Sequence, residues 1–222
     1  MSENPFEPAS VDELPTQLPV FPLPGATLLP GTQLPLNIFE PRYVNMMLDA
    51  LGSARMIGMI QPEAGVLESD SPVLYGVGCA ARIVSFAESG DGRLLITLRG
   101  VCRYRTAEEL PLLRGYRRFV PTWAGFAADL GPATHLEHSI EELKAALDDY
   151  LRIKEVRVDW DGLSQVPAHS AVDFLAMNLP FAPNEKQALL EASKGAARWQ
   201  ALLAITGMTS SSSQHPSRET RH

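Results

Sequence analysis

The hydrophobic pattern changes along the chain, from a period of two residues to the three-and-four spacing of helices. Between residues 14 and 126, short apolar runs alternate with turn residues, which predicts strands. The clearest run is 93–106, where one face is apolar and the other carries Arg93, Arg99, Arg103 and Arg105 and is expected to face solvent. The predicted strands are 20–21, 34–38, 55–61, 75–86, 93–106 and 116–123, with a hairpin loop at 88–92.

The pattern beyond Trp123 is helical. Five apolar residues recur at alternating steps of four and three, which makes one helix face apolar: Leu136, Ile140, Leu143, Leu147 and Tyr150. A capping box at Thr134–Glu137 is expected to begin this helix. Three more helices are expected, from Ser170, from Asn184, and from Gly195 to about Ile205.

This change of period predicts two parts in an α+β fold. We expect a partly open antiparallel β-barrel at 14–126, followed by a small helical bundle at 127–208. The ends, 1–13 and 209–222, have little apolar surface to bury and are expected to be flexible tails.

Composition narrows the class of protein. The chain has 222 residues, of which 45% are hydrophobic and 20% are charged, as in ordinary globular proteins. A net charge of −7 argues against a general nucleic-acid binder, which usually carries a basic excess. The first residues lack an apolar signal segment and no run is long enough to span a membrane, so a cytoplasmic protein without membrane contact is expected. Cys79 and Cys102 are expected to be buried thiols.

Residues 18–43, LPVFPLPGATLLPGTQLPLNIFEPRY, hold two short apolar segments separated by prolines and glycines. The last four of these residues, from Glu40 to Tyr43, are expected to open a helix with Pro41 near its first turn. The form of residues 18–43 resembles the start of the amino-terminal, substrate-binding domain of Lon-type proteases, as found in short bacterial proteins that carry this domain alone. Similar family segments are recognised at 57–62, 76–83, 92–104 and 172–191. The resemblance implies a pseudo-barrel related to the PUA fold, followed by a helical bundle.

The resemblance also implies a function. It predicts non-catalytic binding of unfolded or misfolded polypeptides, with a role as adaptor or regulator of a protease. The alternative is an RNA- or small-ligand-binding module of the PUA-like group. The sequence has no G-x-x-x-x-G-K-[ST] phosphate loop, and the ATPase and peptidase modules of the full protease do not follow, so no cofactor is expected. A homo-oligomer is compatible with the sequence.

Catalytic and metal-binding residues are not predicted. Ser193 adjoins Lys194, but no peptidase motif surrounds this pair, and neighbours one residue apart on a helix point to different faces. His135, His138 and Glu141 recur every three residues, and we interpret them as charged surface, because zinc sites need three or four convergent ligands.

Two groups of residues are candidates for binding. Aromatic and methionine side chains that adapt to irregular partners gather after the second strand, and they predict a peptide site at Phe39, Tyr43, Met46 and Met47. The sequence leaves open a core role for them. A basic patch is the alternative site, formed by Arg99, Arg103, Arg105, Arg117 and Arg118. It is read as a solvated strand face, with an RNA site or a protein-partner surface as the alternatives.

Overall fold

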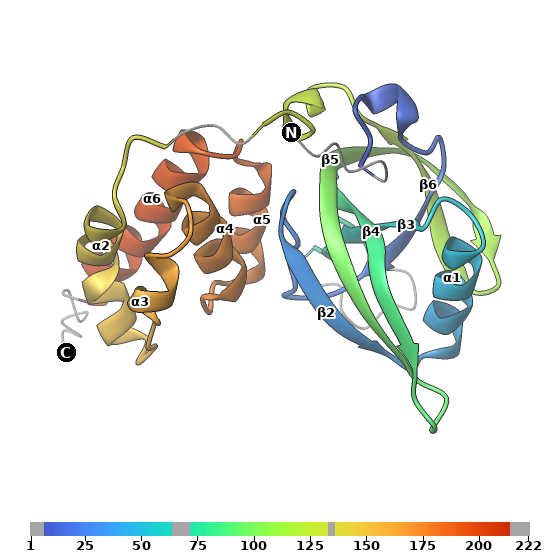
Figure 1. Ribbon diagram of the computed structural model, residues 1–222, viewed down its shortest axis with the longest axis horizontal. Coiled ribbons are helices and arrows are strands. Elements are labelled where there is room, and N and C mark those ends of the chain that lie inside the picture. Colours follow the sequence, from blue (N-terminus) through green and yellow to red (C-terminus); the bar gives the residue numbers. More distant parts are fainter. Residues whose placement is uncertain (1–6, 64–71, 133–135, 214–222) are drawn as a thin grey trace, which may run out of the picture. The chain divides into compact units, whose positions relative to one another are not determined.

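The chain divides into two compact units, Met1–Pro132 and Ala133–His222 (Figure 1). The structure, a computed structural model, describes residues 7–63, 72–132 and 136–213. The first unit is built on a sheet and the second on helices. The α+β class expected from the change of period is confirmed.

The described part of the first unit contains six strands and one α-helix. In chain order its elements are the 3-10 turn η1 (Val11–Glu13), β1 (Leu18–Pro22), β2 (Gln33–Ile38), α1 (Pro41–Leu51), β3 (Met56–Ile60), β4 (Val77–Glu88), β5 (Leu94–Leu113), β6 (Tyr116–Thr122) and the 3-10 turn η2 (Ala127–Asp129). The predicted strands all appear, and β5 is longer than expected, since it continues past Thr106.

Strands β1, β3, β4, β5 and β6 form a ring, and β2 lies outside it. The strand order is β2-β5-β4-β3-β1-β6, and β6 pairs again with the carboxyl-terminal half of β5. The amino-terminal half of β5 pairs with β2, from Gln33↔Arg99 to Ile38↔Leu94. Strand β2 therefore ends the sheet on one side of this pseudo-barrel, as Figure 1 shows in blue.

One pair of strands departs from the expected antiparallel barrel. Strands β1 and β3 pair in parallel, with Val20 opposite Gly58. The chain leaves β1, forms β2 and α1, and returns in its original direction. Parallel neighbours need such a long crossover connection.

Helix α1 begins as the sequence predicts. Pro41 occupies the first turn, where its missing N–H costs no hydrogen bond, and Glu40 is the N-cap residue. The helix buries one face against the sheet, and the buried residues are Tyr43, Met46, Met47 and Ala50. Their spacing of three, one and three is that of a single helix face.

Two glycines make room for Tyr104 in the core of the first unit. A Cβ atom at Gly58 would collide with the Tyr104 hydroxyl, and a Cβ at Gly78 would lie 2.7 Å from the same ring. Tyr104 is fully buried. The glycines that the sequence places in these two strands therefore allow a close approach between an aromatic ring and the backbone.

Both cysteines are buried, and neither is in a disulfide. This confirms the prediction of buried thiols at Cys79 and Cys102, which lie on the adjacent strands β4 and β5.

Every element of secondary structure described in the second unit is an α-helix. Its helices are α2 (Ile140–Ile153), α3 (Trp160–Leu163), α4 (Ala168–Asn178), α5 (Pro183–Glu191) and α6 (Ala196–Ser213). Leu143, Leu147 and Tyr150 are buried, which confirms the apolar stripe predicted for α2. Helix α3 is a single turn that hydrophobic periodicity does not reveal.

The first predicted helix start is wrong. Helix α2 begins at Ile140, with Ser139 and Glu142 forming the capping box, while Leu136 and Glu137 precede the helix. Thr134 lies outside the described residues. Ser139 and Glu142 carry the same kinds of side chain as the predicted box, and the buried Leu136 lies in irregular chain before the helix.

Two other helix ends also differ from the prediction. Helix α5 begins at Pro183 rather than Asn184, and Glu185 accepts a 2.7 Å hydrogen bond from the N–H of Ala182. Helix α6 continues to Ser213, into the segment 209–222 that was expected to be a flexible tail. Residues 214–222 lie outside the described residues.

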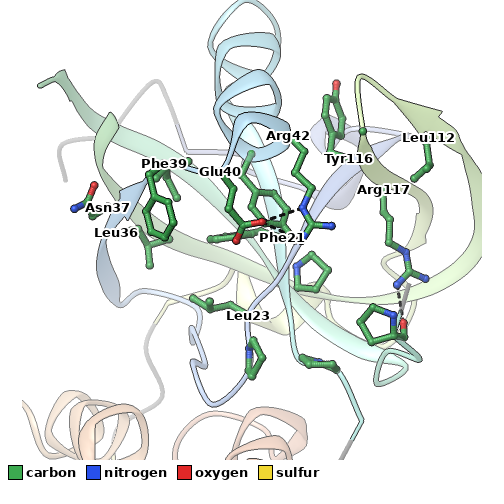
Figure 2. A pocket seen from close by; sticks show the side chains of 17 residues that line it. Phe21, Leu23, Leu36, Asn37, Phe39, Glu40, Arg42, Leu112, Tyr116 and Arg117 are labelled. Atoms are coloured by element: carbon green, nitrogen blue, oxygen red, sulfur yellow. Dashed lines mark hydrogen bonds and ion pairs between the residues drawn. The ribbon is translucent and has the colours of Figure 1, made fainter. Parts of the chain in front are cut away.

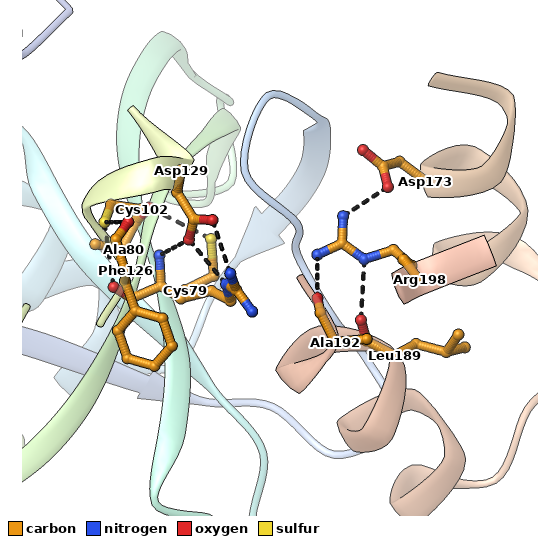
Figure 3. Close-up of polar contacts among 10 residues, drawn as sticks. Cys79, Ala80, Cys102, Phe126, Asp129, Asp173, Leu189, Ala192 and Arg198 are labelled. Atoms are coloured by element: carbon orange, nitrogen blue, oxygen red, sulfur yellow. Dashed lines mark hydrogen bonds and ion pairs between the residues drawn. The ribbon is translucent and has the colours of Figure 1, made fainter. Parts of the chain in front are cut away.

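A buried arginine organises the helical unit. Arg198 is fully buried, and its guanidinium donates to the carbonyls of Leu189 and Ala192, at 3.0 Å each (Figure 3). It also donates to the Asp173 carboxylate at 2.6 Å. Arg198 thus satisfies carbonyls at the end of α5 and joins them to α4.

Candidate functional site

A groove of about 500 Å³ opens in the first unit beside β2. Its wall comes from five separate places in the chain: the end of β1 with the following residues, the junction of β2 and α1, Pro62, Pro72, and the turn between β5 and β6 (Figure 2). We call it the β2 groove. A volume of this size is typical of ligand-binding clefts.

The first side of the β2 groove is the junction of β2 and α1. Leu36 and Ile38 lie two positions apart, on the same face of β2, and both line the groove. Phe39 follows immediately and is 63% exposed, with the Arg93 guanidinium 5.7 Å from its ring centroid. Phe39 is therefore a large apolar side chain that the fold leaves uncovered.

The aromatic pair Phe21 and Tyr43 also lines the groove, and both rings are buried. Their centroids are 4.5 Å apart in an edge-to-face arrangement. Burial raises the pKa of Tyr43. Met46 and Met47 lie on the same face of α1 as Tyr43, are fully buried, and do not line the groove.

The structure therefore separates the four residues of the predicted peptide site. Phe39 is exposed in the groove, and Tyr43 lines it from a buried position. Met46 and Met47 have no surface to offer a ligand, because the helix period turns them toward the sheet.

Prolines dominate the opposite side of the groove. Pro22 and Pro24 flank Leu23, whose N–H donates to the Ile60 carbonyl at 3.0 Å, and Pro62 and Pro72 lie nearby. None of these prolines has an N–H to offer a neighbouring strand. Sequence reasoning missed this role, although the density of prolines in the first motif was a signal for it.

The turn between β5 and β6 completes the groove with Leu112, Gly115, Tyr116 and Arg117. Leu112 is 63% exposed. Arg114 and Gly115 have φ angles of 48° and 87°, which is the pattern of a tight hairpin turn with both central residues left-handed. Sequence reasoning placed Arg117 in the alternative basic patch and did not assign Leu112, Gly115 or Tyr116 to a site.

A polar cluster holds this turn against α1. The Asp49 carboxylate accepts from the Arg114 guanidinium at 2.6 Å and from the Tyr116 hydroxyl at 2.9 Å. Burial raises the pKa of Tyr116 to about 12, and the hydrogen bond to Asp49 adds to this effect. The cluster therefore fixes the distance between two walls of the groove.

The charged residues at the rim are paired with one another. Arg42 contacts Glu40 at 3.0 Å. Arg117 contacts Glu109 at 2.6 Å and also donates to the Pro72 carbonyl at 2.7 Å, as Figure 2 shows for the latter bond. An anionic ligand would have to compete with these contacts, so the groove suits an uncharged one.

The arginines of the predicted basic patch are engaged within the unit. Arg99 pairs with Glu7 at 2.8 Å, and Arg118 donates to the Pro111 carbonyl at 3.1 Å. Arg117 pairs at the groove rim, and Arg105 is exposed. Three of these guanidinium groups already have partners within the unit, so this surface is poorly suited to binding phosphate.

Arg103 does not belong to an exposed patch. The solvent-facing position predicted for it is wrong, since its side chain is only 4% exposed and pairs with Asp129. Alternation along β5 assigned Arg103 to the outer face, but η2 covers that face and supplies the counter-charge.

The other residues considered for metal binding or catalysis do not form a metal site or an active site in the described part of the chain. His138 stacks on Trp199, with centroids 4.5 Å apart, and contacts Glu142 at 3.0 Å, while His135 lies outside the described residues. Ser193 and Lys194 lie in the connection between α5 and α6 rather than on a helix. No group of three or more His, Cys, Asp or Glu side chains within 7–63, 72–132 and 136–213 could hold a metal ion. No helix in the same ranges is long and apolar enough to cross a membrane.

The sequence profile of the ATP-dependent protease La (LON) substrate-binding domain matches residues 17–206. The chain belongs to this family. The resemblance seen in residues 18–43 is thereby confirmed, and the matched LON domain covers the groove and both units.

Full-length Lon proteases are related to this LON domain protein. Lon protease 2 of Sorangium cellulosum is 30% identical over 201 residues, covering 86% of this chain and 24% of the relative. The Lon protease of Desulfosudis oleivorans is 24% identical over 195 residues, covering 82% of this chain and 22% of the relative. The chain thus spans about a quarter of the length of these curated relatives.

Solved structures show the same fold. The Lon N-terminal domain protein from Xanthomonas campestris matches with a TM-score of 0.59 and 26% identity, over 86% of this chain and 98% of that one. The N-terminal domain of the Mycobacterium avium complex Lon protease matches with a TM-score of 0.57 at 16% identity, which supports the fold alone.

Proposed function

We propose that this LON domain protein binds segments of unfolded polypeptide in the β2 groove and does not cleave them. One observation carries the proposal: two large apolar side chains, Phe39 and Leu112, are each 63% exposed in one groove whose charged residues are paired with one another. Membership of a substrate-binding family supports the assignment.

The groove has the chemistry that an unfolded chain requires. An unfolded segment presents apolar side chains in no fixed order, so a surface that accepts it must make little demand on sequence. Exposed apolar side chains such as Phe39 and Leu112 meet this requirement. Ordering a flexible chain costs free energy, so we expect dissociation constants in the micromolar range.

Binding without cleavage would suit an adaptor or regulator that delivers clients to a protease or competes with one. The sequence contains no phosphate loop and no recognisable serine–lysine peptidase motif. We therefore expect neither ATP hydrolysis nor cleavage of fluorescent casein by the purified chain, with or without ATP.

The test uses a client that cannot fold. Binding of fluorescein-labelled, reduced and carboxymethylated α-lactalbumin is measured by fluorescence anisotropy for the parent and for Phe39→Asp. A charge in the groove should weaken binding about tenfold, the effect expected for an aromatic anchor. The matched control is Phe86→Asp, since Phe86 is 52% exposed but does not line the groove.

The binding results distinguish the β2 groove from another site, and polypeptide binding from RNA binding. Equal loss in both variants would show that the β2 groove is not the site. Failure of the parent to bind the client, together with retention of structured RNA at moderate salt, would overturn the proposal in favour of an RNA-binding module.

A further inference from the structure

We infer that the bound polypeptide adds to the outer edge of β2 as an extra β-strand, so that its backbone is held by hydrogen bonds to Gln33, Pro35 and Asn37. This inference rests on the proposed function and deepens it, because it defines the bound segment as extended, uncharged and alternately apolar.

The direction of the β2 backbone groups follows from the pairing with β5. The Gly100 N–H donates to the Thr32 carbonyl at 2.9 Å, so the Thr32 carbonyl points toward β5. The N–H and C=O groups of successive residues in a strand point alternately to its two edges. In the register of β2 with β5, the N–H and C=O groups of Leu34, Leu36 and Ile38 therefore also point toward β5. Those of Gln33, Pro35 and Asn37 point away.

Pro35 agrees with this assignment independently. A proline has no N–H to donate to a ladder and is tolerated in a strand where its nitrogen faces the outer edge. Pro35 pairs with Thr97 at a position that needs no such donor, and its side chain is exposed.

The outer edge of β2 therefore offers two N–H donors and three carbonyl acceptors. Within the part of the chain that the structure describes, no strand pairs with it. An edge of this kind is a template for an extended chain, and main-chain hydrogen bonds give affinity without demanding a sequence.

The wall opposite β2 explains why the sheet does not close on itself here. The chain that continues from β1 carries Pro22 and Pro24, and the only N–H between them, that of Leu23, donates to the Ile60 carbonyl. These residues cannot supply the edge of β2 with a full set of donors. A guest strand has backbone groups to offer that this side of the groove lacks.

The side chains of the groove define the guest further. Every second residue of an added strand would lie on the face of β2 that carries Leu36 and Ile38, beside the exposed Phe39. The rim arginines Arg42 and Arg117 are paired with Glu40 and Glu109, so an acidic guest would have to displace these carboxylates. The guest is therefore apolar at alternate positions and uncharged.

Amide exchange tests the pairing directly. The probe is an acetylated, amidated nonapeptide of alternating threonine and valine, and exchange is followed by NMR with and without it. We expect the Gln33 and Asn37 amides to exchange at least tenfold more slowly with the probe, because they gain partners. The amides of Leu34, Leu36 and Ile38 already point to β5 and should change less.

A matched pair of variants provides the second measurement. Asn37→Pro removes the outward N–H without removing a donor to β5, whereas Asn37→Ala retains it. Loss of one hydrogen bond should weaken binding of the fluorescein-labelled nonapeptide by about fivefold in Asn37→Pro relative to Asn37→Ala. Should Asn37→Pro fail to fold, the amide exchange of the parent still decides the question.

The outcomes separate this inference from the proposed function. If unfolded α-lactalbumin binds and Phe39→Asp weakens it, but neither amide is protected and the two Asn37 variants bind alike, strand addition is wrong and groove binding stands. If neither α-lactalbumin nor the nonapeptide binds the parent, the proposed function fails and strand addition fails with it.

Discussion

Arg103 and Asp129 form a buried ion pair in the first unit, although 26 positions separate them in the sequence. The Arg103 guanidinium donates to the two carboxylate oxygens at 2.8 and 2.9 Å, and its backbone N–H donates to one of them at 3.0 Å. Figure 3 shows the Asp129 carboxylate with the dashed lines of its contacts. The Asp129 side chain is only 1% exposed. The pair joins the turn η2 to the middle of β5.

Breaking this pair should be costly. In Asp129→Asn the buried guanidinium loses its counter-charge, and we expect the free energy of unfolding to fall by about 3–5 kcal/mol. Urea denaturation of the parent and the variant measures the change.

The double variant Arg103→Met with Asp129→Leu is the control. It removes both charges, so it should recover part of the lost stability, because apolar residues of similar volume often replace a buried pair at little cost. Recovery stays incomplete because the Arg103 backbone N–H loses its hydrogen bond to the carboxylate. A loss below about 1 kcal/mol in Asp129→Asn alone would show that the pair is not needed for stability.

A methyl group at Gly58 should disturb the core of the first unit. Gly58→Ala places a Cβ against the buried Tyr104 hydroxyl and the Leu18 side chain, and overpacking of this kind costs about 1–3 kcal/mol. Thermal unfolding followed by circular dichroism measures the effect.

Tyr104→Phe tests the cause of that loss. The Tyr104 hydroxyl is buried and has no hydrogen-bond partner among the residues described, so Tyr104→Phe should not destabilise the protein. Combined with Gly58→Ala it should restore part of the lost stability. Purely additive effects would rule out the contact with the hydroxyl as the reason.

Leu143→Ala should destabilise the helical unit by about 2–5 kcal/mol, because Leu143 is completely buried in the stripe of α2. Lys144→Ala, the exposed neighbour on the same helix, should change stability by less than about 0.5 kcal/mol. Chemical denaturation of both variants makes the comparison, and equal effects would mean that this face of α2 does not carry the packing.

Alkaline pH should weaken the polar cluster of Asp49, Arg114 and Tyr116, which joins α1 to the β5–β6 turn. The pKa of Tyr116 is raised to about 12, from an ordinary value of 10.0, by burial and by Asp49. A raised folded-state pKa contributes stability that is complete below the unfolded value and is lost as the pH rises from about 10 toward 12.

Tyr116→Phe isolates this contribution. The free energy of unfolding, measured in urea at pH 8 and pH 11, should fall less between these values in Tyr116→Phe than in the parent. An identical fall in both proteins would show that ionisation of Tyr116 does not limit stability.

The sequence by itself determined the kinds of element and their order. Alternation along 93–106 and the helical stripe of Leu143, Leu147 and Tyr150 both describe the structure, because periodicity reflects which face of a single element is buried. The start of α1 at Pro41 could also be predicted, because the signals that begin a helix lie within one turn.

Tertiary structure decided what local pattern could not. Arg103 lies on the polar face of its strand by alternation, yet it is buried because η2 brings a carboxylate to it from 26 positions away. The β2 groove likewise joins the end of β1, the end of β2 and the β5–β6 turn, which are distant in the chain. Periodicity reports the environment of one element, whereas a buried charge or a groove depends on which elements meet, and that is set by strand pairing across the whole unit.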